Sequence, residues 1–130
     1  MLPLALLVVA LLAASTACGG DSGSEEPEAV VRAFTEAVNE NDNERAAELL
    51  ADGAVVYGEA VPAGGGENIV AGLSCTVEIE STERSGDVVT TDLRFTGHRK
   101  GASGGCAEVG NDPIPTQWTV RDGKITEISE

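Results

Sequence analysis

The chain has 130 residues, and its 22 Asp and Glu against 8 Lys and Arg give it a formal net charge of −14 at pH 7. Such an acidic excess repels phosphate backbones, so it excludes nucleic acid as a partner and disfavours anionic lipid headgroups. The length allows one domain with a modest core and no second domain. Only four residues are aromatic, namely Phe34, Tyr57, Phe95 and Trp118.

Residues 1–14 form an uncharged, mostly apolar run that is too short to span a bilayer and ends in small residues. This pattern predicts the core of a secretory signal peptide. The run continues into Ser15-Thr-Ala-Cys18, which resembles the lipobox of bacterial lipoproteins, although Ser15 stands where that motif usually has leucine. The resemblance implies that residues 1–17 are removed and that Cys18 carries the acyl chains. The alternative is an ordinary signal peptide with an incidental cysteine.

Residues 18–27 are small, polar and acidic, a composition that predicts a flexible tether. Two acyl chains hold a protein stably on a membrane, and an acidic tether keeps the domain off the headgroups. We therefore expect a lipid-anchored protein on the extracytoplasmic face of the cell membrane, with its folded domain in residues 28–130.

The two remaining cysteines, Cys75 and Cys106, lie in a chain expected to enter an oxidising compartment, which favours a disulfide between them. A loop of this length would stabilise the domain by about 3 to 4 kcal/mol in the chain-entropy model. The rivals are two buried thiols or a zinc site with His98. That set lacks a fourth ligand and a known spacing, so we expect no metal and no cofactor.

The first part of the domain has a helical pattern. Residues 39–43 interrupt the pattern, and Asn41 with Glu44 resembles a capping box for a second helix that runs toward Gly53. The first helix has Ser24 as a candidate cap, Pro27 in its first turn, and apolar residues at helical spacing: Val30, Val31, Phe34 and Val38.

The second part alternates like strands, with Val89, Leu93 and Phe95 on one side of a strand and Asp92 and Arg94 on the other, where they are expected to form a surface ion pair. Helices followed by an antiparallel sheet indicate an α+β domain. The predicted strands are 54–57, 75–82, 88–96, 116–120 and 124–128; the other predicted features are a loop at 62–66, a brief helix at 67–73, a hairpin at 84–87, a glycine-rich loop at 97–113 and a tight turn at Asp122-Gly123.

Four segments together, residues 29–34, 39–42, 46–56 and 118–125, resemble the nuclear transport factor 2-like, or SnoaL-like, superfamily. The resemblance covers nearly all of the exported domain. It implies a cone-shaped, bent antiparallel sheet wrapped around the long N-terminal helix, often with a pocket at the open end.

The superfamily contains ketosteroid isomerase-like enzymes, polyketide cyclases, dehydratases and members that only bind. In the isomerases, a tyrosine on the first helix polarises the substrate carbonyl and an aspartate after the first strand moves the proton. These positions correspond to Phe34 and Gly58 here, so the resemblance implies that this chemistry is absent. An enzyme with a non-standard site would have to use Tyr57, Glu59 or His98. We expect instead that Tyr57 packs at the sheet edge, Glu59 is solvated and His98 lies in a solvated basic turn with Arg99 and Lys100.

The candidate pocket consists of five residues that we expect to converge inside the cone and largely to fill its core: Phe34, Tyr57, Leu93, Phe95 and Trp118. The predicted function is a non-catalytic, membrane-tethered domain for an envelope protein or a small apolar ligand. A further possibility is a protein-interaction surface on the acidic helix face of Glu36, Glu40 and Glu44, with salt-sensitive binding. The polar sheet face favours a monomer or a weak homodimer.

Overall fold

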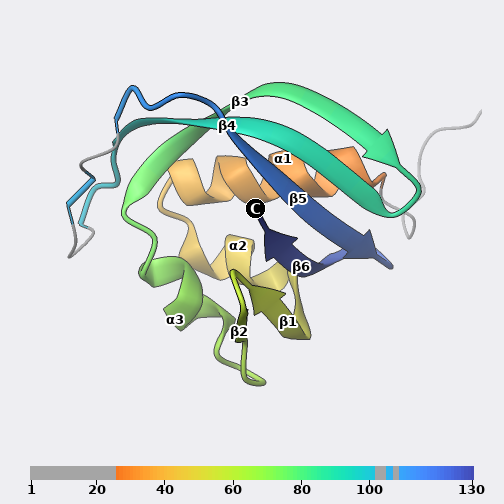
Figure 1. The fold of residues 1–130 in the computed structure, drawn as a ribbon. Coiled ribbons are helices and arrows are strands. Elements are labelled where there is room, and N and C mark those ends of the chain that lie inside the picture. The colour runs from red at the N-terminus through yellow and green to blue at the C-terminus, as the bar shows by residue number, and fades with distance from the viewer. Residues whose placement is uncertain (1–25, 102–104, 107–108) are drawn as a thin grey trace, which may run out of the picture.

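In the computed structural model, which describes residues 26–101, 105–106 and 109–130, a sheet curls around one long helix (Figure 1). The sheet order is β2-β1-β6-β5-β4-β3, and all neighbouring strands are antiparallel except β1 and β6, which are parallel. This arrangement confirms the predicted α+β cone. The elements are α1 (Pro27–Asn39), α2 (Asn43–Glu48), β1 (Leu50–Val56), β2 (Glu59–Ala60), α3 (Gly66–Ala71), β3 (Cys75–Ser85), β4 (Val88–His98), β5 (Ile114–Arg121) and β6 (Lys124–Ser129).

Helix α1 buries the apolar stripe that its sequence predicts, and it lies in the concave side of the sheet (Figure 1). Pro27 occupies the first turn, where its missing N–H leaves no hydrogen bond unmade. Glu26 stands at the N-cap without a side-chain bond, and Ser24, the expected cap, lies outside the described residues.

The second helix differs from the prediction at both ends. Its cap is Asp42, whose Oδ1 accepts a hydrogen bond from the backbone N–H of Arg45 at 3.2 Å, because Asn41 adopts a left-handed conformation with φ 62°. The helix ends at Glu48, since Leu50 pairs with Ile125 of β6. Tertiary strand pairing thus shortens a helix whose local pattern continues toward Gly53.

The hairpins follow the turn chemistry of the sequence. Asp122 and Gly123 both have positive φ, 53° and 76°, as a two-residue turn between antiparallel strands requires. Strands β3 and β4 run longer than expected, with Gly86-Asp87 as the turn between Ser85 and Val88.

The best-packed part of the core lies beneath the first turns of α1. We call it the closed end and define it as Val30, Val31, Val89, Val120 and Ile125, all at most 2% exposed. None of these five lines a cavity among those found in the structure. Within the described ranges, no helix is long and apolar enough to cross a membrane.

Candidate functional site: a cavity at the open end

A cavity of about 470 Å³ lies between α1, α3 and the inner face of the sheet. Its lining includes all five residues of the candidate pocket: Phe34, Tyr57, Leu93, Phe95 and Trp118. Phe34, Leu93 and Trp118 are also buried core residues, so the cavity lies directly against the core. The sequence-based preference for a filled interior therefore missed an open space of this size.

The deep wall of the cavity is aromatic. The rings of Phe34 and Trp118 meet edge to face, with centroids 5.8 Å apart and planes at 68°. The indole Nε1–H of Trp118 donates to Thr91 Oγ1 at 2.9 Å. The polar group of the indole is thus satisfied by the protein, and this wall presents apolar surface to a ligand.

The mouth of the cavity is marked by the lining residues that are exposed to solvent: Tyr57, Gly72, Gly105 and Glu130. Tyr57 is 50% exposed and stands in the turn after β1 at φ 50°, an uncommon conformation for a bulky residue. Its backbone N–H donates to Ile128 O at 2.8 Å, which places it beside the end of β6.

Tyr57 and Glu130 are the two titratable side chains among the described lining residues, because Cys75 is bonded to Cys106. Burial raises the pKa of the Tyr57 phenol, the negative charge of Glu130 raises it further, and a hydrogen bond with Thr116 partly offsets both effects. The Tyr57 phenol is therefore neutral near neutral pH.

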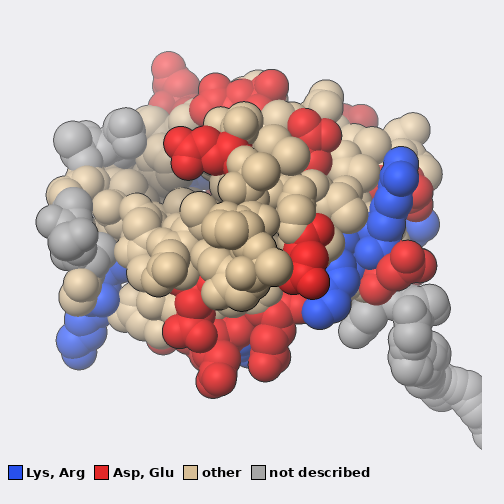
Figure 2. Space-filling view, turned by 90° about the horizontal axis from the view of Figure 1, so that it is seen from below, with Lys and Arg blue, Asp and Glu red and all other residues tan. Residues whose placement is uncertain are grey.

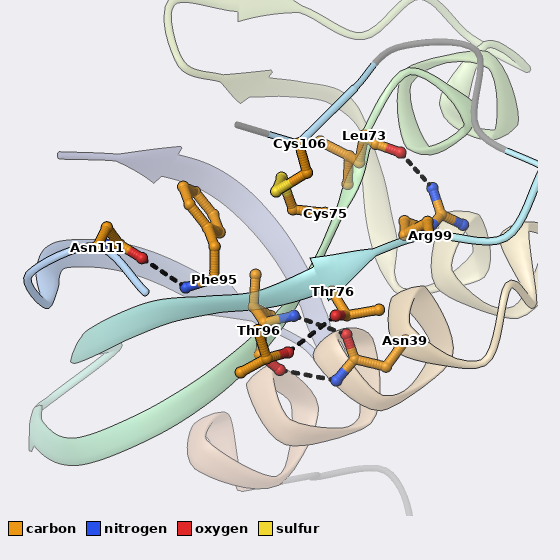
Figure 3. Close-up of a disulfide and its surroundings, with 10 residues drawn as sticks. Asn39, Leu73, Cys75, Thr76, Phe95, Thr96, Arg99, Cys106 and Asn111 are labelled. Atoms are coloured by element: carbon orange, nitrogen blue, oxygen red, sulfur yellow. Dashed lines mark hydrogen bonds between the residues drawn. A yellow bond between two sulfur atoms is a disulfide. The ribbon is translucent and has the colours of Figure 1, made fainter. Parts of the chain in front are cut away.

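A disulfide between Cys75 and Cys106 borders the cavity, and Figure 3 shows it bridging β3 and the long loop after β4. The two Cα atoms are 5.3 Å apart, and 31 residues separate the cysteines in sequence. Cys75 and the neighbouring Gly105 both line the cavity. The far part of the loop is held by Asn111, whose Oδ1 accepts from the backbone N–H of Phe95 at 2.7 Å.

Arg99 is a structural residue that the sequence analysis misplaced. It is 3% exposed, so the expected solvated turn is wrong at this position, although His98 and Lys100 on either side are exposed. Its guanidinium donates to backbone oxygens of Val38 at 2.9 Å and of Val70 and Leu73, both at 2.8 Å.

A fourth hydrogen bond from Arg99 goes to Asn43 Oδ1, and burial lowers the pKa of the guanidinium. Arg99 therefore joins the ends of α1 and α3 to the start of α2. Figure 3 shows its bond to Leu73 close to the disulfide.

Asn39, the last residue of α1, fixes the start of strand β3 (Figure 3). Its amide donates to Val77 O at 2.8 Å and accepts from Val77 N–H at 2.9 Å. Strand β3 has a register shift at this point, between Thr76 and Val77. The side chain thus satisfies backbone groups at an irregularity in the edge strand of the sheet.

The residues considered for an enzymatic site do not meet in one place. Tyr57 lines the cavity, but Glu59 is exposed on β2 and His98 is exposed at the end of β4, and neither belongs to the lining. Phe34 lines the cavity where the isomerase resemblance requires tyrosine. The described part of the chain contains no group of three His, Cys, Asp or Glu that could hold a metal ion.

Several surface expectations change with the structure. Arg94 pairs with Glu80 at 2.6 Å and not with Asp92, which accepts a hydrogen bond from Ser81. Arg94 on β4 and Glu80 on β3 are cross-strand neighbours, and cross-strand pairs are the side-chain contacts that stabilise a sheet. On the acidic helix face, Glu36 and Glu40 both approach Arg45, at 3.4 and 3.6 Å.

The predicted signal peptide (1–17), the predicted acylation site Cys18 and residues 19–25 of the predicted tether lie outside the described residues. Figure 2, seen from below, shows an uncharged central area with Asp and Glu side chains above and below it, and Lys and Arg side chains at its right and lower left.

Comparison with known proteins identifies the fold. The family model of the SnoaL-like domain matches residues 31–128. Solved structures with this fold include a cystatin-fold protein from Novosphingobium aromaticivorans (17% identity, TM-score 0.64, covering 82% of this chain and 97% of the other). No curated protein sequence matches the chain.

Two other similar structures contain ligands. One is a Mycobacterium tuberculosis protein in complex with estradiol-17β-hemisuccinate, with 18% identity, a TM-score of 0.59 and coverage of 81% and 92% of the two chains. The other is a protein of ketosteroid isomerase-like fold from Catenulispora acidiphila in complex with trimethylamine, with 21% identity, a TM-score of 0.56 and coverage of 77% and 82%. At these identities the likeness establishes the fold alone.

Proposed function

The chain belongs to the SnoaL-like family, which includes isomerases, cyclases and ligand-binding proteins, and we propose that it is a membrane-tethered member that binds a small, largely apolar ligand without transforming it. The observation that carries this proposal is the cavity of about 470 Å³, a volume in the range of small-molecule sites. Its deep wall is formed by Phe34 and Trp118, and the aliphatic residues Val38, Leu50 and Leu93 extend it.

The cavity supports binding better than catalysis. The isomerase positions hold Phe34 and Gly58, which can neither donate a hydrogen bond from a side chain nor carry a proton. Glu59 and His98 do not line the cavity. The fold itself accommodates ligands, as the similar structures with estradiol-17β-hemisuccinate and trimethylamine illustrate.

The location in this proposal rests on residues 1–27. The apolar run, the lipobox-like Ser15-Thr-Ala-Cys18 and the acidic spacer support an exported domain held at the membrane by acyl chains on Cys18. A disulfide between Cys75 and Cys106 fits an oxidising compartment.

Ligand binding is tested with N-phenyl-1-naphthylamine, a neutral apolar dye that fluoresces when it enters an apolar cavity. Trp118, the single tryptophan, lines the cavity and transfers energy to a dye bound there. We expect saturable binding of one dye per chain, and at least about tenfold weaker binding in Val38→Phe, whose ring occupies cavity volume.

The matched control is Val31→Leu, on the same helix but outside the cavity lining, which should bind the dye as the parent does. Circular dichroism establishes that both variants fold. Absence of saturable binding, or equal binding by folded Val38→Phe, would contradict the proposed function.

The membrane anchor is tested separately by intact mass spectrometry of the protein purified from bacterial membranes, with Cys18→Ala as control. We expect a mature chain that begins at a diacylated Cys18, and loss of both acylation and processing in Cys18→Ala. A soluble, unacylated parent chain would overturn the tethered location and leave ligand binding to be judged by the dye.

A further inference from the structure

The charge at the cavity mouth has one sign. Glu130 lines the mouth, and no Lys, Arg or His is found among the described lining residues. An anionic ligand would therefore meet a negative mouth without a partner for its own charge.

The buried Arg99 does not change this balance. It is 3% exposed and does not line the cavity. Its guanidinium is occupied by four hydrogen bonds to carbonyl oxygens, three from backbone and one from Asn43. Its donors are thus committed to holding the helices and are not presented to a ligand.

Tyr57 and Glu130 stand beside one another because of strand register. Val56 pairs with Ile128, and the N–H of Tyr57 donates to Ile128 O at 2.8 Å. Glu130 comes directly after the end of β6, two residues beyond Ile128, and both residues line the cavity. The effect of Glu130 on the pKa of the Tyr57 phenol agrees with this closeness.

A carboxylate beside a phenol ring is a suitable site for an organic cation. The carboxylate supplies the opposite charge, and the ring face attracts a cation through its quadrupole. Two polar groups of the deeper lining are already bonded within the protein, since the Trp118 indole N–H donates to Thr91 and the Thr35 hydroxyl donates to Arg32 O. The cavity therefore suits a molecule with one polar end at the mouth and an apolar body inside.

We propose that the ligand class of this cavity is a protonated amine with a compact apolar body, with its ammonium group at the mouth between Glu130 and Tyr57 and its body against Phe34, Leu93 and Trp118. This inference rests on the proposed function and names its ligand chemistry.

The test compares three probes that share one apolar body and differ in the head group: 1-adamantanemethylamine, 1-adamantanemethanol and 1-adamantanecarboxylate. Binding is followed by Trp118 fluorescence and calorimetry at pH 7 and low salt. We expect the amine to bind at least about tenfold more tightly than the carboxylate, with the alcohol between them.

The charge assignment is tested with Glu130→Gln, which should bring the amine and the carboxylate to within about threefold of each other and leave alcohol binding unchanged. Glu127→Gln is the matched control, because Glu127 is an exposed carboxylate on β6, three residues before Glu130, that does not line the cavity. It should retain the preference of the parent chain.

The outcomes separate the two proposals. If the alcohol and the naphthylamine dye bind but the amine has no advantage over the carboxylate, the amine inference is overturned and the proposed function stands. If Glu127→Gln abolishes the preference as fully as Glu130→Gln does, the assignment to the mouth is overturned. If none of the probes binds, the proposed function itself fails.

Discussion

The two ends of the helix–sheet core are built in different ways. At the closed end, Val30 and Val31 of α1 pack with Val89, Val120 and Ile125, and all five side chains are at most 2% exposed. At the open end, the later turns of α1 face a cavity of about 470 Å³, and its walls are held apart by polar and covalent links. These links are made by Arg99, by Asn39 and by the disulfide between Cys75 and Cys106.

The difference shows how a small domain keeps a cavity open. Hydrophobic contact alone favours collapse of apolar walls onto one another, since it has no direction. Hydrogen bonds and a disulfide fix positions, and they hold the ends of α1 and α3 and the start of β3 without filling the space between them. We therefore expect the closed end to be sensitive to side-chain volume and the open end to the loss of specific links.

The largest expected effect is at Arg99. Replacement by Met removes all four hydrogen bonds of the buried guanidinium, which should cost about 4 kcal/mol in the free energy of unfolding, although Val38 O and Val70 O keep the backbone N–H donors of Asn41 and Leu73. Urea denaturation measures this loss in the free energy of unfolding. The matched control is Arg121→Met, whose ion pair with Asp87 is exposed on the surface, and its midpoint should hardly move. Equal losses in the two variants would contradict the role of Arg99.

The disulfide comes next. Cys75→Ala with Cys106→Ala should lower the free energy of unfolding by about 3 to 4 kcal/mol, because the unfolded chain regains the freedom of a loop of about 30 residues. Reduction of the parent chain should give the same midpoint in urea. We also expect weaker dye binding, since Cys75 and Gly105 border the cavity. A midpoint that reductant leaves unchanged would show that the bond does not contribute.

Side-chain volume should matter more at the closed end. Ile125→Ala removes a fully buried side chain and should cost about 3 kcal/mol, whereas Ile114→Ala at the half-buried cavity wall should cost about 1 kcal/mol. Both values come from the same urea series. If the two substitutions cost the same, the distinction between a packed end and an open end does not hold.

The smallest effect is the titration of Tyr57, which absorbance at 295 nm reports directly because the chain has one tyrosine. Burial and the charge of Glu130 raise the phenol pKa above its ordinary value of 10.0, so ionisation should begin at higher pH than in a free peptide. The raised pKa contributes stability below pH 10 that is lost as the pH rises through the folded-state value. Glu130→Gln should lower the midpoint, and an unchanged midpoint would place Glu130 away from the phenol.

Local patterns in the sequence determined the architecture. The helical spacing of Val30, Phe34 and Val38 is set by neighbours within a few residues, and it predicts α1 and its buried face. The turn at Asp122-Gly123 depends on two adjacent residues and was equally predictable.

Only the tertiary structure decided the end of α2, the burial of Arg99 and the cavity. Leu50 leaves the helical pattern to pair with Ile125, far along the chain. The carbonyl partners of Arg99 lie 26 to 61 residues away in sequence, and the run His-Arg-Lys by itself indicates a solvated turn. A cavity is the space left between distant elements. No local spacing encodes it, because its volume depends on how those elements are held apart.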